Sequence, residues 1–320
     1  MSRPSVVAFG GGHGLAASLH ALRRVTDALT AVVTVADDGG SSGRIRSELG
    51  SLPPGDLRMA LAALAADDEW GRVWSQVYQY RFGGGGTLDG HAVGNLVLTA
   101  LTDITGDPVA ALDLAGRLVR GTGRVLPLAT SALEIVADVV GLDADDSGRA
   151  VEVRGQVAVA TTPGRVVAVR IEPAEPVACA EAVQAVHDCD WAVLGPGSWF
   201  TSVIPHLLVP DMAKALAGSP ARVCVALNLS PQPGETDGFS PETHLEVLAA
   251  HAPELEVAVV LADRSAVVGD EPGLREAAAG LGARLVVADV AARDGTPRHD
   301  PERLAAAYDE IFTGGDRSWQ

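Results

Sequence analysis

The sequence of 320 residues has few aromatic side chains, few cysteines and no long apolar run. Aromatic residues make up only 4% of the chain, so its core must be built from smaller side chains, chiefly Ala, Val and Leu. The three cysteines, Cys179, Cys189 and Cys224, are odd in number and lack CxxC spacing, which argues against a disulfide framework and a zinc site. We expect them to be small buried side chains in a reducing compartment.

Positive charge is also scarce, since the chain has 24 basic and 41 acidic residues and a net charge of −17. No overall field therefore attracts nucleic acid or an anionic membrane. No uninterrupted apolar run reaches about 18 residues, and residues 1–12 lack the apolar segment of a signal peptide. We expect a cytoplasmic protein without membrane insertion, which captures any anionic ligand locally, by glycine loops and a few arginines.

Apolar runs and helical spacings alternate along most of the chain. A strand at 5–9, a helix within 14–29 and a strand at 31–36 predict a βαβ unit with a right-handed crossover. Residues 56–127 have mostly helical spacing, and residues 151–173 read as a β-hairpin or small meander around TTPG. After residue 188, strands at 191–195, 222–229, 257–263 and 284–290 alternate with helices that begin near 201 or span about 241–251, 273–280 and 301–312.

This alternation predicts the α/β class: a Rossmann-like parallel sheet with helices on both faces. We expect a single domain over residues 1–320, with a helical insertion at about 56–127 and a β-hairpin addition at about 151–173. No sequence repeat or long linker divides the chain.

The first glycine turn, GGGHGL, follows a strand and opens a helix, which is the context that favours phosphate binding. In a GxGxxG pattern the third glycine would fall on an alanine of this chain, which is a tolerated variant. A tight turn without a ligand is the alternative. The candidate ligand-binding residues of this turn are Gly10, Gly11, Gly12, His13 and Gly14.

The second strand leads to TVADDGGSSGRIR, in which two aspartates precede glycines, serines and arginines. An acid at this position can accept ribose hydroxyls or hold Mg²⁺, and simple turn chemistry is the alternative. Because neighbouring strand residues point to opposite faces, one aspartate is expected to face the ligand and the other the loop. The candidates here are Asp37, Asp38, Gly39, Ser41, Ser42 and Arg44, with Arg46 as a second basic side chain.

Four further loops carry polar residues. In PPGDLR, Asp56 can cap the following helix, and Arg58 lies in its first turn, where it can face the site. In DGHAVGN, His91 and Asn95 share a helical face if that helix starts early, although packing is the usual role of such a histidine. LGPGSWFTS and NLSPQPGETDGFS each follow a buried strand, and their candidates are Gly195, Gly197, Ser198, Thr201, Asn228, Gln232, Glu235, Thr236 and Asp237.

Several of these loops should meet at the carboxyl edge of one sheet, where α/β proteins bind ligands. Two separate glycine turns suit two phosphates, or a phosphate and a sugar. A nucleotide ligand is therefore the leading interpretation of the residues.

The same motifs resemble a known family. GGGHGL, TVADDGGSSGRIR, LPPGDLR, GHAVGN, ITGD, LGPGSWFTS and QPGETDGFS, in this order between about residues 5 and 250, look like the YvcK family, or gluconeogenesis factors, of the CofD-like superfamily. The resemblance implies a cytoplasmic bacterial protein that binds UDP-N-acetylglucosamine and is linked to gluconeogenic growth, cell shape and peptidoglycan precursor supply. It also implies a homodimer with regulatory protein partners and no established reaction.

The resemblance implies that most of these candidate residues contact the ligand: Gly10, Gly11, Gly12, Gly14, Asp37, Asp38, Gly39, Ser41, Ser42, Asn95, Gly195, Gly197, Ser198 and Asn228. The chain departs from the family pattern at two positions, where His13 replaces the usual Thr and Met59 the usual Asn. His13 removes a hydroxyl donor from the first turn, and Met59 removes a polar side chain near the ligand or metal.

Three other functions remain open at this stage. The chain could be a transferase that uses a nucleotide-diphosphate donor, as the 2-phospho-L-lactate transferases of the superfamily do, with Asp37 or Asp38 as the catalytic candidates that hold Mg²⁺. It could be an NAD-dependent oxidoreductase, which the extra GGSSGRIR loop and second glycine turn fit less well. It could instead sense its ligand and change a protein interaction.

Overall fold

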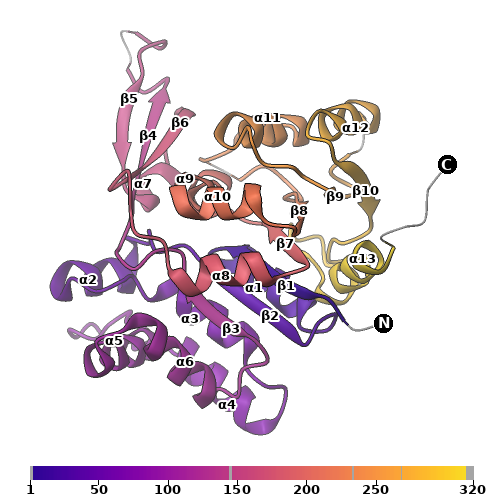
Figure 1. Cartoon of the computed structure of the whole chain (residues 1–320). Coiled ribbons are helices and arrows are strands. Elements are labelled where there is room, and N and C mark those ends of the chain that lie inside the picture. The colour runs from indigo at the N-terminus through magenta and orange to yellow at the C-terminus, as the bar shows by residue number, and fades with distance from the viewer. Residues whose placement is uncertain (1–2, 144–145, 233, 268, 315–320) are drawn as a thin grey trace.

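The computed structural model describes residues 3–143, 146–232, 234–267 and 269–314. Its centre is a seven-stranded sheet in the order β10-β9-β8-β7-β1-β2-β3, in which every neighbouring pair is parallel. A second, three-stranded antiparallel sheet projects from it (Figure 1). The predicted α/β class with a parallel sheet is confirmed.

The chain starts with the predicted βαβ unit: β1 (Ser5–Gly10), α1 (Gly12–Leu22) and β2 (Ala28–Val33). Both strands are buried along most of their length, as expected for a parallel sheet covered on both faces. β2 ends earlier than the predicted strand, so Asp37 and Asp38 follow an extended segment rather than the last sheet residue.

The second half supplies β7 (Trp191–Leu194), β8 (Arg222–Ala226), β9 (Val259–Asp263) and β10 (Arg284–Ala288). The connecting segments hold the short helices η1 (Trp199–Val203) and α9 (Pro205–Leu208), then α10 (Pro210–Gly218), α11 (Pro241–His251) and α12 (Glu271–Gly280), and α13 (Pro301–Thr313) follows β10. On one side of β1, the strands β2 and β3 follow in order. On its other side lies β7, and β8, β9 and β10 follow from there in the opposite direction. The direction of growth therefore reverses between β1 and β7.

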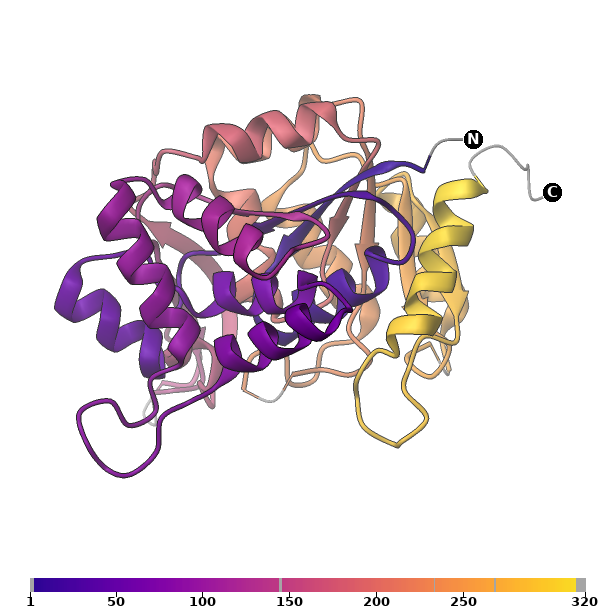
Figure 2. The same ribbon diagram turned by 90° about the horizontal axis from the view of Figure 1, so that it is seen from below.

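Helices cover both faces of this sheet (Figure 2). On one face α1 packs against both α13 and α3 (Gly55–Leu64), and on the other α10 packs against α8 (Ala180–Asp188). Within the described residues, no helix is both long enough and apolar enough to cross a membrane.

The insertion after β2 contains α2 (Gly40–Leu49), α3, α4 (Glu69–Gln79), α5 (Val93–Thr105), α6 (Pro108–Leu118) and the strand β3 (Arg124–Pro127). Two of these elements differ from the sequence interpretation. α2 covers the stretch that was read as a loop, because Gly40, Ser41, Ser42 and Gly43 fill only its first turn and RIRSEL continues the helix. β3 was read as part of the helical region, because its four residues are too few to show a period.

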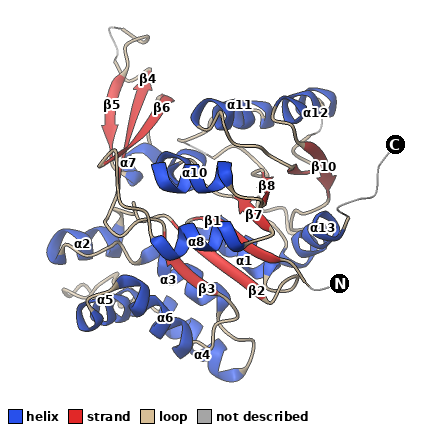
Figure 3. Ribbon diagram, viewed as in Figure 1, coloured by secondary structure: helices blue, strands red, loops and turns tan. Residues whose placement is uncertain are grey.

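The antiparallel addition, called the arm below, consists of β4 (Glu134–Val140), β5 (Val151–Arg154), α7 (Gln156–Ala160) and β6 (Arg165–Glu172). A small antiparallel addition was predicted, but β5 and β6 do not pair with each other as in a hairpin. β4 lies between them, in the order β5-β4-β6 (Figure 3). The strand β4 was not predicted, and it provides the partner of both runs.

The buried hydroxyl of Ser18 joins three parts of the fold. It lies 3.1 Å from the carbonyl oxygen of Gly195, to which it donates, and 3.0 Å from the hydroxyl of Tyr308 on α13. Both Ser18 and Tyr308 are fully buried. Their bonds therefore connect α1, α13 and the loop after β7.

We predict that Ser18→Ala lowers the free energy of unfolding by about 1–3 kcal/mol, because it leaves two buried polar groups without this partner. Ser47→Ala is the matched control: Ser47 is exposed, and surface changes of this kind usually stay within about 0.5 kcal/mol. Urea unfolding of both variants measures the difference. Equal stabilities would contradict the role assigned to Ser18.

Candidate functional site

The loops after β1 and β7 meet where the sheet changes its direction of growth. At Gly14, an added Cβ would lie 2.3 Å from the carbonyl oxygen of Pro196 and 2.5 Å from Cα of Gly197, so only glycine permits this approach. Gly12 has φ +56°, in the region that favours glycine. Switch points of this kind are where open α/β sheets bind ligands.

The two neighbouring aspartates point in different directions. Asp38 accepts a hydrogen bond from the backbone N–H of Val157 at 2.9 Å, so its carboxylate holds the start of α7 in the arm. Asp37 accepts from the N–H of Gly39 at 2.9 Å, and its other oxygen would lie 2.5 Å from a Cβ added at Gly55. Asp37 therefore lies beside the starts of α2 and α3, while Asp38 serves the arm.

Asp56 is the second carboxylate at this edge of the sheet. It lies over the first glycine turn, since a Cβ added at Gly11 would be 2.4 Å from its Oδ2, and this oxygen has no hydrogen-bond partner among the described residues. Burial, together with the charge of Asp37, raises its pKa from 3.8 to about 7. The capping role expected for Asp56 is wrong, because α3 has no side-chain cap and its Ncap is Pro54.

Polar side chains gather at the start of α2. Ser41 lies 3.0 Å from Nδ1 of His91 and accepts from Nδ2 of Asn95 at 3.0 Å, and all three residues are buried. The Oδ1 of Asn95 has no partner within the part of the chain that is described. Ser42 lies beside Asp37, because a Cβ at Gly55 would be 2.4 Å from the Ser42 hydroxyl. His91 thus joins this cluster, although its sequence context did not favour a site role.

The arginines near the cleft differ in their surroundings. Arg44 donates to the carbonyl of Asp89, and Arg46 donates to the carbonyl of Leu133 at 2.7 Å. Arg58 is buried and donates to Gln79. Burial lowers the Arg58 pKa to about 10, although the charges of Asp56 and Asp37 act to raise it. Arg58 is accordingly the buried cation beside the two carboxylates.

The loop after β7 is held by internal partners. The N–H of Gly197 donates to Asn228 at 2.9 Å, and the Asn228 amide donates back to Gly197 O at 2.9 Å. Glu235 accepts from the N–H groups of Phe200 and Thr201 at 2.8 and 2.9 Å. The sequence predicted that amides of this loop would bind a phosphate. These two amides instead bind the carboxylate of Glu235, and burial raises the pKa of that carboxylate.

The remaining candidates lie around this centre. His13 is exposed in the first turn of α1, and Ser198 is half-buried at the start of η1. The backbone of Gln232 bonds to Thr236, and its side-chain oxygen is buried without a partner in the described parts of the chain. Asp237 accepts from the N–H of Gly234 at 2.9 Å, so it shapes its own turn.

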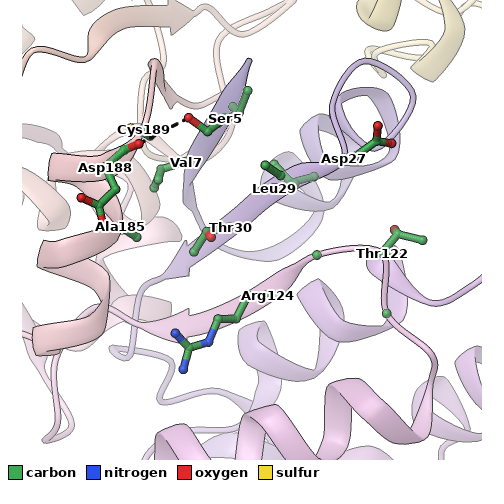
Figure 4. Close-up of a pocket in the computed structure, with 14 residues that line it drawn as sticks. Ser5, Val7, Asp27, Leu29, Thr30, Thr122, Arg124, Ala185, Asp188 and Cys189 are labelled. Atoms are coloured by element: carbon green, nitrogen blue, oxygen red, sulfur yellow. Dashed lines mark hydrogen bonds between the residues drawn. The ribbon is translucent and has the colours of Figure 1, made fainter. Parts of the chain in front are cut away.

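A separate surface pocket of about 530 Å³ opens at the opposite, amino edge of the sheet (Figure 4). Its charged side chains already have partners: Arg124 pairs with Asp113 at 2.8 Å, and Asp27 pairs with Arg3 at 3.0 Å. None of the glycine turns lines it. The carboxyl edge is therefore the candidate ligand site.

A divalent cation fits the pair formed by Asp37 and Asp56. The partnerless oxygen of Asp56 and its raised pKa indicate a carboxylate that Arg58 compensates only in part. The described residues contain no group of three or more His, Cys, Asp or Glu able to hold a metal. Mg²⁺ is often held by one or two carboxylates plus phosphate oxygens, so this pair suits a cation that arrives with a phosphorylated ligand.

Comparison with known proteins identifies the relatives of this fold and site. Residues 6–294 match the family model described as 2-phospho-L-lactate transferase CofD. A protein of Mycobacterium tuberculosis, provisionally named a gluconeogenesis factor, is 56% identical over 96% of this chain and 90% of its own length. The Bacillus subtilis protein named gluconeogenesis factor is 36% identical, over 78% of this chain and 75% of its own.

A solved structure shares the whole architecture. The crystal structure of a UPF0052 family protein from Bacillus halodurans superposes with a TM-score of 0.84 at 31% identity, over 96% of this chain and 99% of that one. The similarity therefore extends across both sheets and the helical insertion.

The Asp56 carboxyl makes a pH dependence testable. Because its pKa is raised in the fold, the folded state binds the proton more tightly than the unfolded chain, and the associated stability is lost as the pH rises from about 4 to about 7. A shift of this size corresponds to roughly 4 kcal/mol. We predict that Asp56→Asn flattens this decline, as measured by urea unfolding between these pH values.

Asp103→Asn is the control, since Asp103 is exposed on α5. It should keep the wild-type pH profile. A profile of Asp56→Asn that parallels the wild type would show that Asp56 does not ionise in the manner described.

Proposed function

The chain belongs to the CofD family, and on that premise we propose that it binds a nucleotide sugar, UDP-N-acetylglucosamine, at the carboxyl edge of the sheet, beside the loops after β1 and β7. The observation that carries the proposal is the close approach of Gly14 to Pro196 and Gly197. It presents backbone rather than side chains at this edge of the sheet, which suits a diphosphate.

Two helix starts supply donors for the phosphates. α1 begins at Gly12, whose backbone bonds to Asp56, and α2 begins at Gly40; neither N-cap residue has a side-chain cap. The first N–H groups of a helix have no partner within the helix, and its dipole favours an anion there. Ser42 and Asn95 add side-chain groups beside α2, and the free oxygen of Asn95 can accept a bond from a sugar or base.

We further propose that binding, rather than turnover, is the function. Relatives named gluconeogenesis factor support a role in growth on gluconeogenic carbon sources. In this proposal the nucleotide sugar reports the supply of peptidoglycan precursors, and the liganded protein regulates that supply, cell shape and carbon use through protein partners in the cytoplasm.

A Mg²⁺-dependent transferase is the second candidate, and the Asp37–Asp56 pair is the observation that favours it. Bound there, Mg²⁺ would neutralise negative charge on a leaving nucleotide diphosphate. Asp37 and Asp56 would hold the cation, the start of α2 would bind phosphate oxygens, and Arg58 would offset the charge of the carboxylates. The family model's transferase description is compatible with this candidate.

Ligand binding is tested by isothermal titration and thermal shift with uridine, guanosine and adenine nucleotides and with NAD. We predict stabilisation by UDP-N-acetylglucosamine of about 2.7 kcal/mol at a hundredfold excess over Kd, without release of a nucleotide product. Gly14→Ala should weaken binding by at least about tenfold, since its methyl group displaces the opposite loop. Gly86→Ala, in an open loop, should bind as the wild type does.

No response to any uridine nucleotide would overturn the binding proposal. Nucleotide release from a diphosphate donor would favour the transferase instead, and a response to NAD alone would favour an oxidoreductase.

The cation is tested with two neighbouring variants. We predict that Mg²⁺ raises the melting temperature of the liganded wild-type protein and that Asp37→Asn abolishes this increase, because Asp37 lies near enough to Asp56 for its charge to raise the Asp56 pKa. Asp38→Asn should keep it, since Asp38 bonds to the arm. If Asp38→Asn alone abolished the Mg²⁺ effect, the assignment of the two aspartates would be reversed.

A further inference from the structure

The short helix α7 joins the arm to the candidate site at the carboxyl edge of the central sheet. Asp38, in the loop after β2, accepts the N–H of Val157 at 2.9 Å, and a Cβ added at Gly155 would clash with the other Asp38 oxygen. Gly155 has φ +96°, in the region that favours glycine, and its N–H donates to the carbonyl of Ile135 on β4 at 2.8 Å. The start of α7 is therefore fixed between the arm and the loop after β2.

Two further loops of this edge also touch α7, which lies at the base of the arm (Figure 1). At Gly234, in the loop after β8, an added Cβ would lie 2.8 Å from the carbonyl oxygen of Ala160, the last residue of α7. η1, in the loop after β7, packs against α7 as well. An element of the second sheet thus lies among the loops that follow β2, β7 and β8.

Val157 brings an exposed apolar side chain to this edge. It is 48% exposed, yet its Cγ2 lies so near the loop after β2 that a Cβ added at Gly39 would be 2.8 Å away from it. Gly39 is the N-cap of α2, the helix start that the proposed function gives to a phosphate. A ligand bound at this helix start therefore comes close to the Val157 side chain.

Gln156 adds a polar atom that has no partner. Its Oε1 is buried and accepts no hydrogen bond within the described ranges of the chain. The residues on either side of it, Gly155 and Val157, both contact the loop after β2. A buried acceptor without a donor costs stability, so a donor is expected from outside the protein. An amide oxygen accepts from an N–H group, and a nucleobase and an acetamido sugar each carry one.

We propose that α7 forms one wall of the ligand site, in which Val157 packs against the ligand and the Gln156 amide oxygen accepts a hydrogen bond from one of its N–H groups. The inference rests on the proposed function, because it takes the start of α2 as the position of a phosphate. It gives the arm a direct part in binding, which none of the sequence motifs indicated. Both residues would contribute to specificity, since a phosphate alone offers neither an apolar surface nor an N–H donor.

The first test changes the charge at residue 157 and measures Kd for UDP-N-acetylglucosamine by isothermal titration. Val157→Glu should raise Kd about tenfold at low salt, because it places a carboxylate beside a bound phosphate. Val157→Lys should keep Kd at or below the wild-type value, and high salt should reduce both effects. A position that only supports the fold would respond to both charges in the same direction.

Val167→Glu and Val167→Lys are the matched controls. Val167 lies on β6 of the same arm and is 43% exposed, against 48% for Val157. These variants therefore carry the same charges on a similarly exposed residue of a strand, and neither should change Kd. Far-UV circular dichroism establishes that all four variants are folded.

The second test removes the free acceptor. Gln156→Leu keeps a side chain of similar size without the oxygen, so it should raise Kd about fivefold, while the unliganded variant melts at or above the wild-type temperature. Gln76→Leu, at an exposed position of α4, should leave Kd unchanged.

A comparison of three ligands locates the donor. If Gln156→Leu weakens binding of UDP, UDP-glucose and UDP-N-acetylglucosamine alike, the N–H group belongs to the base. If it weakens only UDP-N-acetylglucosamine, the N–H group belongs to the acetamido substituent of the sugar.

Two results would overturn the inference and leave the proposed function intact: effects of the same sign for Glu and Lys at residue 157, or a wild-type Kd of Gln156→Leu for all three ligands. If the wild-type protein binds no uridine nucleotide, the proposed function fails and the inference fails with it.

Discussion

The approach of two backbone loops at Gly14 and Gly197 is the constraint on which the site depends. It occurs where the sheet reverses its direction of growth, and it tolerates no side chain on Gly14. Other buried groups hold the loops at this distance: Ser18 bonds to Gly195, Asn228 bonds twice to Gly197, and Glu235 binds the amides that follow. Much of the polar chemistry near these loops thus maintains their positions, and it leaves the start of α2 for a ligand, whereas Asp56 lies over the start of α1.

The electrostatics of the cleft are unbalanced in the absence of a ligand. Asp56 is buried near Asp37, and the partial compensation comes from Arg58, itself buried. Such an arrangement costs stability at neutral pH. A cation or a proton restores the balance, so ligand binding, metal binding and pH act on the same pair of carboxylates.

Sequence patterns predicted the parts of the fold that depend on long apolar runs. The βαβ start, the four later strands and the sheet edge with its glycine turns follow from such runs. The helix α2 was missed, because Gly40, Ser41 and Ser42 favour a loop when judged locally. β4 was also missed, and without it the two flanking runs appeared to pair with each other.

The candidate site was only partly accessible to sequence reasoning, since three-dimensional contacts decide what each polar residue does. An acid at the start of a helix is expected to cap it, yet Asp56 faces Gly11 across the chain. The sequence alone does not assign different roles to Asp37 and Asp38, and only the position of α7 shows that Asp38 bonds to the arm. Likewise, His91 and Asn95 meet at Ser41 because α5 lies beside α2.

The bond between Asp38 and Val157 has a mechanical consequence. Asp38 anchors the projecting arm, and the charge of the next residue toward the amino terminus, Asp37, raises the pKa of Asp56. One peptide unit therefore joins the root of the arm to Asp37. A shift of α7 that moved the backbone of Asp38 would also move the neighbouring carboxylate whose charge acts on Asp56.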